Sequence, residues 1–374
     1  MSEKLLEEIK QEIDQLPRIE KETGEKYYAN KDKLIKTVND ILADRDNIEN
    51  LIGYNPLELM KENHENHARF MGNVFILNEY RMLIDTVPWV YNTYRQKGFS
   101  YKYFHQELKA WKQAIKTILG SKKTASILKI YDWLIENHDK FITISQGLNS
   151  YDPVFENEDE REFERFLEAL LMGEDKKAQQ IAEDNIETKE DFREFTGNVI
   201  KPVMYTIGLM WEQNDIAPAE EHRATSIAAR ILSSFYTKYL PEQHSQGKAV
   251  VSAVANEHHE LGARIIADCL EFDGWDVSFL GADTHGEELI DYLLEEKPFL
   301  LGLSVCVPYN LKELKEIVEK IRCESALQGI KILVGGKALN DFPYLLEKMK
   351  ADDRAEDGSS ALEIANRWWR NRND

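Results

Sequence analysis

The sequence is poor in cysteine and in long apolar runs. Its three cysteines, Cys269, Cys306 and Cys323, lie far apart in the last third of the 374 residues. That spacing excludes a disulfide framework and a zinc knuckle. The longest apolar stretch with almost no charge, residues 298–308, is much shorter than the roughly 20 residues that span a bilayer, and residues 1–10 are charged and lack the apolar core of a signal peptide. We therefore expect a cytoplasmic protein without membrane contact.

Basic charge is also in deficit. Lys and Arg number 47 against 67 Asp and Glu, a net charge of −20. A negative field of this size repels phosphate backbones, so we expect no direct binding of nucleic acid. Hydrophobic residues make up 43% of the chain, too many for a disordered acidic tail, and this indicates a globular protein. The length predicts roughly two to three domains.

The periodicity of apolar residues divides the chain into three blocks. Helical periodicity runs through residues 1–240 and changes at Lys248 to short β-branched runs alternating with amphipathic helices. Loop-like residues 147–153 and a linker at 239–247 separate the blocks. We predict a helical domain over 1–148, a four-helix bundle over 152–242 and an α/β domain over 247–374. The bundle helices are expected at 163–171, 176–185, 191–211 and 218–240.

The last block has the pattern of a doubly wound, Rossmann-like sheet. Single helices separate its strands, which implies parallel pairing with right-handed crossovers. In such a sheet ligands bind outside the carboxyl ends of the strands. Four strands are expected, at 249–254, 275–280, 299–305 and 330–334, with a fifth not placed between Lys337 and Gly358; the helices are expected at 260–271, 286–295, 310–321 and 360–369.

Polar residues and glycines follow these strands at the ligand-binding end. Glu257, His258 and His259 come directly after the first strand. An imidazole there can bind a metal through Nε2 while a carboxylate two residues earlier accepts the Nδ1 proton and fixes the ring. Gly262 leaves backbone open to a bulky ligand. The alternative is that the two histidines are solvated loop residues. The third and fourth strands end in Ser304, Val305 and Cys306, and in Gly335 and Gly336.

This arrangement resembles the cobalamin-binding domain. The domain's pattern D-x-H-x-x-G, S-x-L and G-G reads here Glu257-x-His259-x-x-Gly262, Ser304-x-Cys306 and Gly335-Gly336. The resemblance implies that His259 replaces the dimethylbenzimidazole of cobalamin as the lower cobalt ligand, and that the displaced nucleotide tail lies beside Gly262, Ser304 and the two glycines. Glu257 and Cys306 depart from the usual Asp and Leu. The longer side chain of Glu257 is expected to shift or loosen the His259 ring.

A second resemblance lies in the bundle. Trp211 is followed, after nine residues, by Glu221 and His222. This spacing is similar to the W-x9-E-H signature in the helical cap of cobalamin-dependent regulators and photoreceptors, including adenosylcobalamin-binding repressors of the MerR type. It implies that Trp211 covers the upper corrin face and that Glu221 and His222 line the cavity of the upper ligand. Some photoreceptors of this type carry His directly after the Trp, where this chain has Glu212. The alternative is an ordinary core Trp.

The aromatic-rich first block resembles the last half of a globin. Residues 88–104 precede helices expected at 107–119 and 125–144, and Tyr94 stands four residues before Gly98, at the place of the proximal His. A Tyr disfavours ordinary haem ligation, although Tyr is a possible haem ligand. His64 and His67 are expected on the opposite wall.

A globin-like pocket without its His ligand, joined to a cobalamin module, resembles the photocobilins, which hold a bilin such as biliverdin in a neighbouring helical domain. A bilin needs a flat aromatic slot and polar partners. Because no cysteine precedes Cys269, a bilin here is expected to bind without a thioether bond. The alternative is a ligand-free helical domain that serves dimerisation or partner docking. The candidate bilin contacts are Trp89, Tyr94, Tyr101, His64, His67 and His105.

Together these resemblances imply a sensory or regulatory protein rather than an enzyme. It would bind adenosylcobalamin, with or without a bilin, respond to light, and signal through a change in domain arrangement or in oligomeric state, as a homo-oligomer or with a partner protein. The alternative is a corrinoid carrier that moves a methyl group between partner methyltransferases. A mutase subunit and a DNA-binding repressor are disfavoured, because the sequence shows neither a substrate barrel nor a basic recognition helix.

Overall fold

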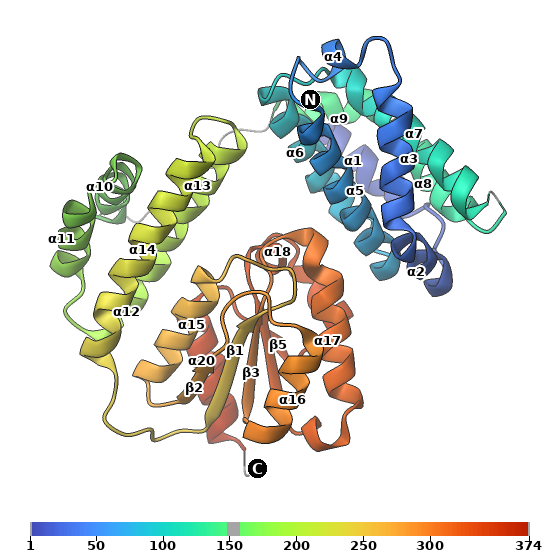
Figure 1. Cartoon of the computed structure of the whole chain (residues 1–374). Helices are drawn as coiled ribbons and strands as arrows, with labels where there is room; N and C mark the ends of the chain where they lie inside the picture. Colours follow the sequence, from blue (N-terminus) through green and yellow to red (C-terminus); the bar gives the residue numbers. More distant parts are fainter. Residues whose placement is uncertain (1, 121, 148–157, 373–374) are drawn as a thin grey trace. The chain divides into compact units, whose positions relative to one another are not determined.

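The structure of the chain, a computed structural model, describes residues 2–120, 122–147 and 158–372 (Figure 1). The chain divides into two compact units, Met1–Ser150 and Tyr151–Asp374. The second unit contains both the bundle and the α/β domain expected from the sequence. Of the loop expected at 147–153, all but Gly147 lies outside the described residues.

The first unit is helical throughout its described residues. Helix α5 packs against α2 and α3, α3 packs against α7, and α6 packs against α9. Aromatic rings fill the interior, among them the fully buried Trp111, Tyr103 and Tyr131. The helices are α1 Ser2–Ile13, α2 Lys21–Ala29, α3 Lys31–Ala43, α4 Ile48–Leu51, α5 Leu57–Leu77, α6 Met82–Gln96, α7 Tyr101–Leu119, α8 Ala125–Glu136 and α9 His138–Ser145.

One expected helix of this unit is in fact two. The helix predicted at 125–144 breaks at the buried Asn137, between α8 and α9. The amide Nδ2 of Asn137 donates to the Trp133 carbonyl at 3.1 Å and to Glu12 Oε2 at 2.8 Å. Such local bonds from an Asn side chain compete with continuation of a helix. The helical class of the unit is confirmed, whereas its globin-like helix order stays a prediction.

The second unit begins with the expected bundle. The third bundle helix, predicted at 191–211, contains a π-helical turn, and Pro202 accounts for it. Pro202 has no N–H, and its ring would clash with the carbonyl four residues earlier in an α-helix. In the wider turn the Lys201 N–H donates to the Thr196 carbonyl, five residues back. The elements are α10 Glu158–Met172, α11 Asp175–Asn185, α12 Lys189–Phe195, the π-helical turn Thr196–Ile200, α13 Lys201–Glu212 and α14 Pro218–Tyr239.

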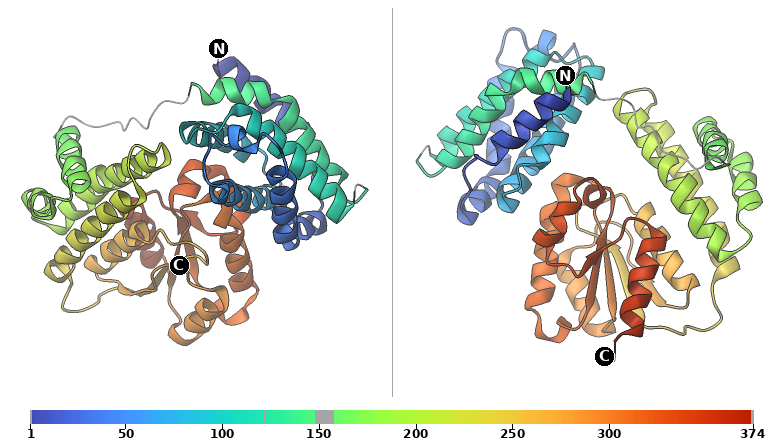
Figure 2. Two further views of the ribbon diagram at one scale, coloured as in Figure 1. Left: turned by 45° about the horizontal axis from the view of Figure 1, so that its top comes forward. Right: turned by 180° about the vertical axis from the view of Figure 1, so that it is seen from behind.

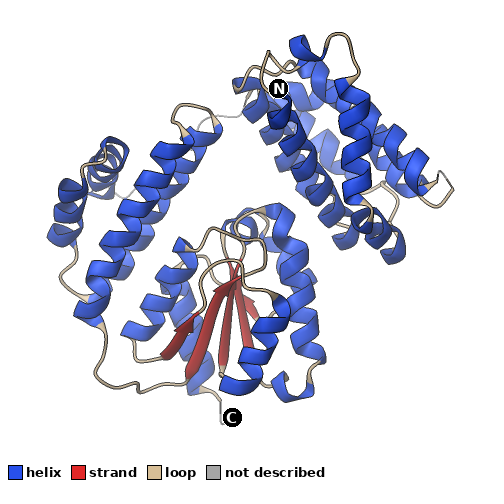
Figure 3. Cartoon of the chain, in the orientation of Figure 1, coloured by secondary structure: helices blue, strands red, loops and turns tan. Residues whose placement is uncertain are grey.

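A five-stranded parallel sheet follows, in the order β2-β1-β3-β4-β5. All strand pairs are parallel, and the arrows in Figure 3 point toward one end. The central strands β1 and β3 are almost wholly buried, as expected where helices cover both faces. The predicted doubly wound sheet is therefore confirmed. The strands are β1 Lys248–Ala253, β2 Asp276–Phe279, β3 Leu300–Ser304, β4 Lys331–Gly335 and β5 Asp353–Arg354.

Helices cover the sheet, and one of them joins it to the bundle. α15 packs with α20 on one face, and α16 packs with α17 on the other (Figure 2). Ile265, Cys269 and Phe272 of α15 belong to the hydrophobic core of the bundle, while Ala263 and Ala267 pack toward the sheet. Bundle and sheet thus share α15. The helices are α15 Leu261–Phe272, α16 Gly286–Glu296, α17 Leu311–Cys323, α18 Lys337–Asp341, α19 Leu346–Met349 and α20 Gly358–Arg370.

Candidate functional site

The strand order creates a switch point between β1 and β3. From β1 the chain continues to β2 on one side of it, whereas β3 lies on the other side. Loops that leave neighbouring strands in opposite directions open a crevice at the carboxyl edge of the sheet. The loop after β1 carries Glu257 and His259, and β3 ends at Ser304. The structure therefore brings these predicted site residues to the place where such sheets bind ligands.

Glu257 and His259 form a close pair in the first of these loops. The Glu257 side chain is fully buried, whereas the His259 side chain is 64% exposed. His259 donates to Glu257 Oε1 through Nδ1 at 2.5 Å and through its backbone N–H at 3.1 Å. The other ring nitrogen, Nε2, has no hydrogen-bond partner within the described ranges. A carboxylate on Nδ1 leaves the lone pair on Nε2, which is the form of imidazole that ligates metals.

The second oxygen of Glu257 reaches the loop after β3. Glu257 Oε2 accepts the backbone N–H groups of Cys306 at 2.8 Å and Val307 at 3.1 Å, and Nδ2 of Asn310 at 3.3 Å. These donors fix the carboxylate to which His259 donates. That the longer side chain shifts or loosens the His259 ring stays a prediction. The additional methylene lets one carboxylate tie two loops together.

Asn310 was missed by the sequence analysis. It is fully buried, and its Nδ2 also donates to the Asn256 carbonyl at 2.8 Å. It lies 53 residues from Glu257 in the chain, at the end of a short 3₁₀ turn that resembles an ordinary helix start. Only the parallel pairing of β1 and β3 brings the two residues together, so no local pattern identifies Asn310.

The electrostatics of the pair favour an electron-rich imidazole. The hydrogen bond to Glu257 raises the pKa of His259 against the opposing effect of burial, and the negative charges of Glu257 and Glu221 raise it further. Burial raises the pKa of Glu257, but hydrogen bonds from His259 and from the Val307 backbone outweigh burial and hold that pKa below its usual range. The carboxylate stays ionised, which increases the basicity of Nε2.

The remaining predicted residues of this edge pack closely around the two loops. Ser304 pairs in register with Gly335, and Val305 is fully buried. Gly336 has a φ of +98°, and a Cβ there would lie 2.3 Å from the Val305 carbonyl oxygen. Packing between strand ends therefore accounts for Gly336. Cys306 Sγ lies 4.0 Å from the His259 carbonyl oxygen, and burial raises the pKa of its thiol to about 12.

Gly262 and His258 differ from this packed group. No heavy atom lies within 4 Å of a Cβ built on Gly262, so the space beside the first turn of α15 is open, as predicted. His258 is exposed. It precedes His259 in the chain but takes no part in the Glu257 hydrogen bonds within the described residues.

The three bundle candidates lie at the two helix ends that a short loop connects. Trp211, in the last turn of α13, is 42% exposed. Glu221, in the first turn of α14, accepts a hydrogen bond from Thr225 Oγ1 at 2.8 Å and lies 3.6 Å from Nε2 of the exposed His222. Since the charge of Glu221 raises the pKa of His259, this turn of the bundle lies near the metal-ligand candidate.

α13 also contacts the loops after β4 and β5. Lys337 Nζ, directly after the glycine pair, lies 5.5 Å from the centroid of the Tyr205 ring. Lys201 Nζ donates to the Glu356 carbonyl at 3.3 Å. One side of α13 is therefore turned toward the carboxyl edge of the sheet.

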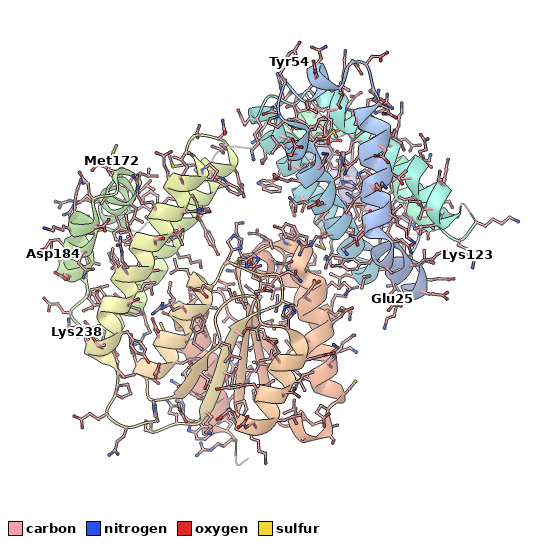
Figure 4. The ribbon with its side chains drawn as sticks, in the orientation of Figure 1. Glu25, Tyr54, Lys123, Met172, Asp184 and Lys238 are labelled. Atoms are coloured by element: carbon pink, nitrogen blue, oxygen red, sulfur yellow. The ribbon has the colours of Figure 1, made fainter. Side chains whose placement is uncertain are left out.

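Exposure alone does not identify Trp211 as a ligand contact. Within the described residues the exposed large apolar side chains are Tyr54, Trp89, Met172, Trp211 and Leu240. Figure 4 labels Tyr54, in the connection between α4 and α5, and Met172, the last residue of α10, both at the surface. Trp211 differs because it extends the helix that contacts the strand ends.

Two surface hollows lie elsewhere in the second unit. One, of about 500 Å³, lies between α11 and α14, and the other, of about 330 Å³, between α12 and α20. Neither is lined by a candidate residue. We therefore locate the candidate site from the Glu257–His259 pair and the switch point of the sheet, and not from these hollows.

His64 and His67 of the first unit belong to its packed core. His64 Nδ1 donates to Asn39 Oδ1 at 2.5 Å, and Nε2 lies 2.9 Å from the Tyr103 hydroxyl. His67 stacks on Trp111 with ring centroids 4.8 Å apart, and its Nε2 lies 3.0 Å from the Tyr131 hydroxyl. Burial lowers the pKa of both histidines to about 3. Both rings are thus neutral and already bonded to protein groups.

The other candidates of the first unit fall into separate groups. Tyr94 packs edge to face against Phe99, with centroids 5.2 Å apart, and Trp89 is 39% exposed on α6. Tyr101 and His105 lie next to rings of another cluster. The ring centroids of Tyr101 and Tyr91 are 6.4 Å apart, and those of His105 and His138 are 5.3 Å apart. Bilin binding by these residues stays a prediction.

Comparison with known proteins bears on the second unit. Residues 247–365 match the family model described as B12 binding domain, and residues 162–234 match a second model with the same description. The chain carries a B12-binding domain. Both models lie outside residues 1–161.

Several known proteins are similar to parts of this chain. A corrinoid protein of Desulfitobacterium hafniense is 21% identical over 54% of this chain and 94% of its own length. The HTH-type transcriptional repressor CarH of Myxococcus xanthus is 26% identical over 40% of this chain and half of its own length. Monomethylamine corrinoid protein 1 of Methanosarcina barkeri is 24% identical over 38% of this chain and 66% of its own. The solved structure of the Methanosarcina barkeri monomethylamine corrinoid protein has a TM-score of 0.49 at 16% identity, covering 55% of this chain and 98% of that one.

The residues at the switch point fit the corrinoid that a B12-binding domain holds. His259 offers a basic, unbonded Nε2, and the open space at Gly262 accepts bulk beside it. In the described parts of the chain no three His, Cys, Asp or Glu side chains form a group that could hold a metal ion. Among those same residues no helix is long and apolar enough to cross a membrane.

Proposed function

We propose that the chain is a cobalamin-dependent sensor, with His259 as the lower axial ligand and the bundle as a cap over the upper face. The observation that carries this proposal is the Glu257–His259 pair, whose Nδ1 is fixed at 2.5 Å while Nε2 stays unbonded. Bound adenosylcobalamin supplies a cobalt–carbon bond that visible light breaks.

The residues of the chain have separate roles in this proposal. Glu257 orients His259 and keeps its ring electron-rich. Gly262 and Ser304, with Gly335 and Gly336, line the path of the displaced nucleotide tail. Trp211, Glu221 and His222 would contact the upper face of the corrin. The position of Glu221 supports this assignment, because its charge acts on His259 from the bundle side.

The contacts between α13 and the strand ends support a sensory role. Two of the contacts that join them are the cation–π contact of Lys337 with Tyr205 and the hydrogen bond of Lys201. Each such contact stabilises the packing of α13 on the strand ends by only about 0.5–1.5 kcal/mol. A change of the group beneath the cap can therefore shift the cap, while the apolar joint at α15 keeps bundle and sheet together. Similarity to the repressor CarH is consistent with such a role.

Illumination of the loaded protein tests the sensor. Purified full-length chain is incubated with adenosylcobalamin in the dark, and its absorption spectrum and elution volume are recorded before and after visible light. Both are expected to change. Protein loaded with hydroxocobalamin, which has no cobalt–carbon bond, is the control and should change neither. Bound adenosylcobalamin with an unchanged spectrum and elution volume would show that the sensor proposal is wrong. Biliverdin added to the same protein tests the predicted bilin site of the first unit.

A corrinoid carrier is the second candidate. It is supported by the relatives named monomethylamine corrinoid proteins. A carrier presents a methyl group to partner methyltransferases, so it should bind methylcobalamin at least as tightly as the adenosyl form and should not change its elution volume in light. Titration of the chain with both cofactors in the dark separates the two candidates.

A further inference from the structure

Helix α13 contains a glycine that packing within the protein does not require. Gly208 lies in the interior of α13, where glycine makes a helix less stable than alanine does. No heavy atom lies within 4 Å of a Cβ built on it, apart from its chain neighbours and the backbone of its own helix. A side chain at position 208 would therefore meet no packed neighbour among the described residues.

The direction of this free volume follows from helix periodicity. Residues three and four apart share a helix face, so Gly208 lies on the side of α13 that carries Lys201, Tyr205 and Glu212. Lys201 and Tyr205 contact the loops after β5 and β4, as described above. The opposite side, with Val203 and Ile207, is buried in the core of the bundle. The volume over Gly208 thus opens toward the carboxyl edge of the sheet.

One residue assigned to the upper face lies one helical turn from Gly208 on α13. Trp211 follows it by three residues and is 42% exposed. Glu221, a second such residue, lies in the first turn of α14, which follows α13 after a short loop. Gly262, beside His259, also has no heavy atom within 4 Å of a built Cβ. Open glycine positions therefore lie on the bundle and on the α/β domain.

We propose that Gly208 determines which upper ligand the protein accepts, by leaving room for a group of nucleoside size. The inference rests on the proposed cobalamin site and deepens it. A corrinoid with a nucleoside on its upper face uses the volume over Gly208. A corrinoid whose upper ligand is water or hydroxide does not need it. A side chain at position 208 therefore discriminates between the two classes.

The test compares two cofactors on one variant. Gly208→Leu in the full-length chain is titrated in the dark with adenosylcobalamin and, separately, with hydroxocobalamin. Overpacking of this kind is expected to weaken adenosylcobalamin binding about 10- to 100-fold. Hydroxocobalamin affinity should change less than about twofold. The smaller Gly208→Ala substitution should give an intermediate loss for the adenosyl form only, and it covers the case in which the Leu variant does not fold.

Gly197 provides a matched control. It lies in the π-helical turn that leads into α13, and no heavy atom lies within 4 Å of its built Cβ either. Gly197→Leu should leave both affinities unchanged, and circular dichroism should show equal helix content in all variants.

Each outcome has a distinct meaning. An equal loss of both cofactors in Gly208→Leu makes the glycine a structural requirement and overturns the inference. Unchanged adenosylcobalamin binding shows that the volume is unused and overturns it as well. Failure of the wild-type chain to bind adenosylcobalamin overturns instead the proposed function, before any variant is compared.

Discussion

The two units each contain a buried glutamate next to a histidine, and the pKa values of the two pairs are shifted in opposite directions. In the first unit Glu107 Oε1 lies 3.7 Å from His67 Nδ1 and accepts a hydrogen bond from Trp111 Nε1 at 3.2 Å. Burial raises the pKa of Glu107 to about 7 and lowers the pKa of His67 to about 3. In the second unit the pKa of Glu257 is lowered and that of His259 is raised.

The difference arises from donors and from exposure. Glu257 accepts two backbone N–H groups and Asn310 on one oxygen, and the side chain of its His partner is 64% exposed. Glu107 accepts fewer hydrogen bonds, and the side chains of His67 and Glu107 are only 17% and 4% exposed. An ionised carboxylate beside a neutral imidazole that keeps one ring nitrogen unbonded suits a metal ligand. A neutral pair that is enclosed by other side chains is typical of a packed core.

Removal of His259 should have the largest effect. His259→Ala eliminates the only group we assign to the metal, and we expect cobalamin affinity to fall by more than the roughly 10–100-fold that loss of an outer partner costs. The spectrum of histidine-ligated, base-off cobalamin should also disappear. Spectral titration measures both. The adjacent, exposed His258 gives the matched control, because His258→Ala should bind as the wild type does. Equal losses in the two variants, or a retained spectrum in His259→Ala, would contradict the assignment.

Glu107→Gln tests the neutral pair through pH. A folded-state pKa of about 7, above the ordinary value of 4.5, means that folding favours the protonated acid. Below about pH 4.5 Glu107 therefore does not lower the free energy of unfolding of the first unit. Between about pH 4.5 and pH 7 it lowers that free energy increasingly. The variant should raise the free energy of local unfolding at pH 8 by roughly 1–3 kcal/mol and leave it unchanged at pH 4. The titratable groups around Glu107 are His67, Tyr27, Tyr91, Tyr103 and Tyr131, whose pKa shifts all favour the neutral form.

Hydrogen exchange of peptides from α5 and α7 measures this local stability. Glu65→Gln, at an exposed position of α5, is the control and should not alter its pH dependence. If Glu107→Gln makes the first unit less stable at pH 8, the acid is charged in the folded state, and the contrast between the two pairs disappears.

Tyr103→Phe should have a smaller effect, confined to the first unit. The hydroxyl of Tyr103 bonds to His64 Nε2 at 2.9 Å and accepts Asn63 Nδ2 at 3.2 Å. Its loss leaves two buried polar groups without this partner, at a cost of about 1–2 kcal/mol. Urea unfolding should show the loss, and cobalamin affinity should stay the same. A weakened cobalamin affinity would mean that the core of the first unit takes part in the cobalamin site.

Asn310→Ala should weaken cobalamin binding less than His259→Ala does. Glu257 would lose one donor of several and keep the backbone N–H groups of Cys306 and Val307. We expect about tenfold weaker cobalamin binding with the histidine-ligated spectrum retained. A loss as large as that of His259→Ala would show that Asn310, and not the backbone, holds the carboxylate.

Much of the fold and part of the candidate site could be predicted from the sequence, wherever the signal is local. Buried β-branched runs and the glycines after them located β1 to β4 and the strand ends that carry His259 and Ser304. The two-residue β5 is too short to show a period, and the break at Asn137 depends on a bond to Glu12 from a distant helix.

The features that distinguish the two pairs are long-range. Asn310 meets Glu257 only across two parallel strands. His64 and His67 have the spacing of ligand candidates, and sequence alone does not show that protein groups bond to His64 through both ring nitrogens. The residue type indicates that an imidazole is available, but only the structure shows whether its lone pair is free.

The central claim is that His259 ligates cobalt, and electron paramagnetic resonance tests it most directly. The full-length protein is labelled uniformly with ¹⁵N, loaded with unlabelled cobalamin and reduced to the Co(II) state. Ligation by His259 predicts a superhyperfine doublet from a ¹⁵N nucleus, which the His259→Ala variant should lack. A triplet from ¹⁴N would show that the cofactor's own dimethylbenzimidazole remains on the metal, and would contradict the account.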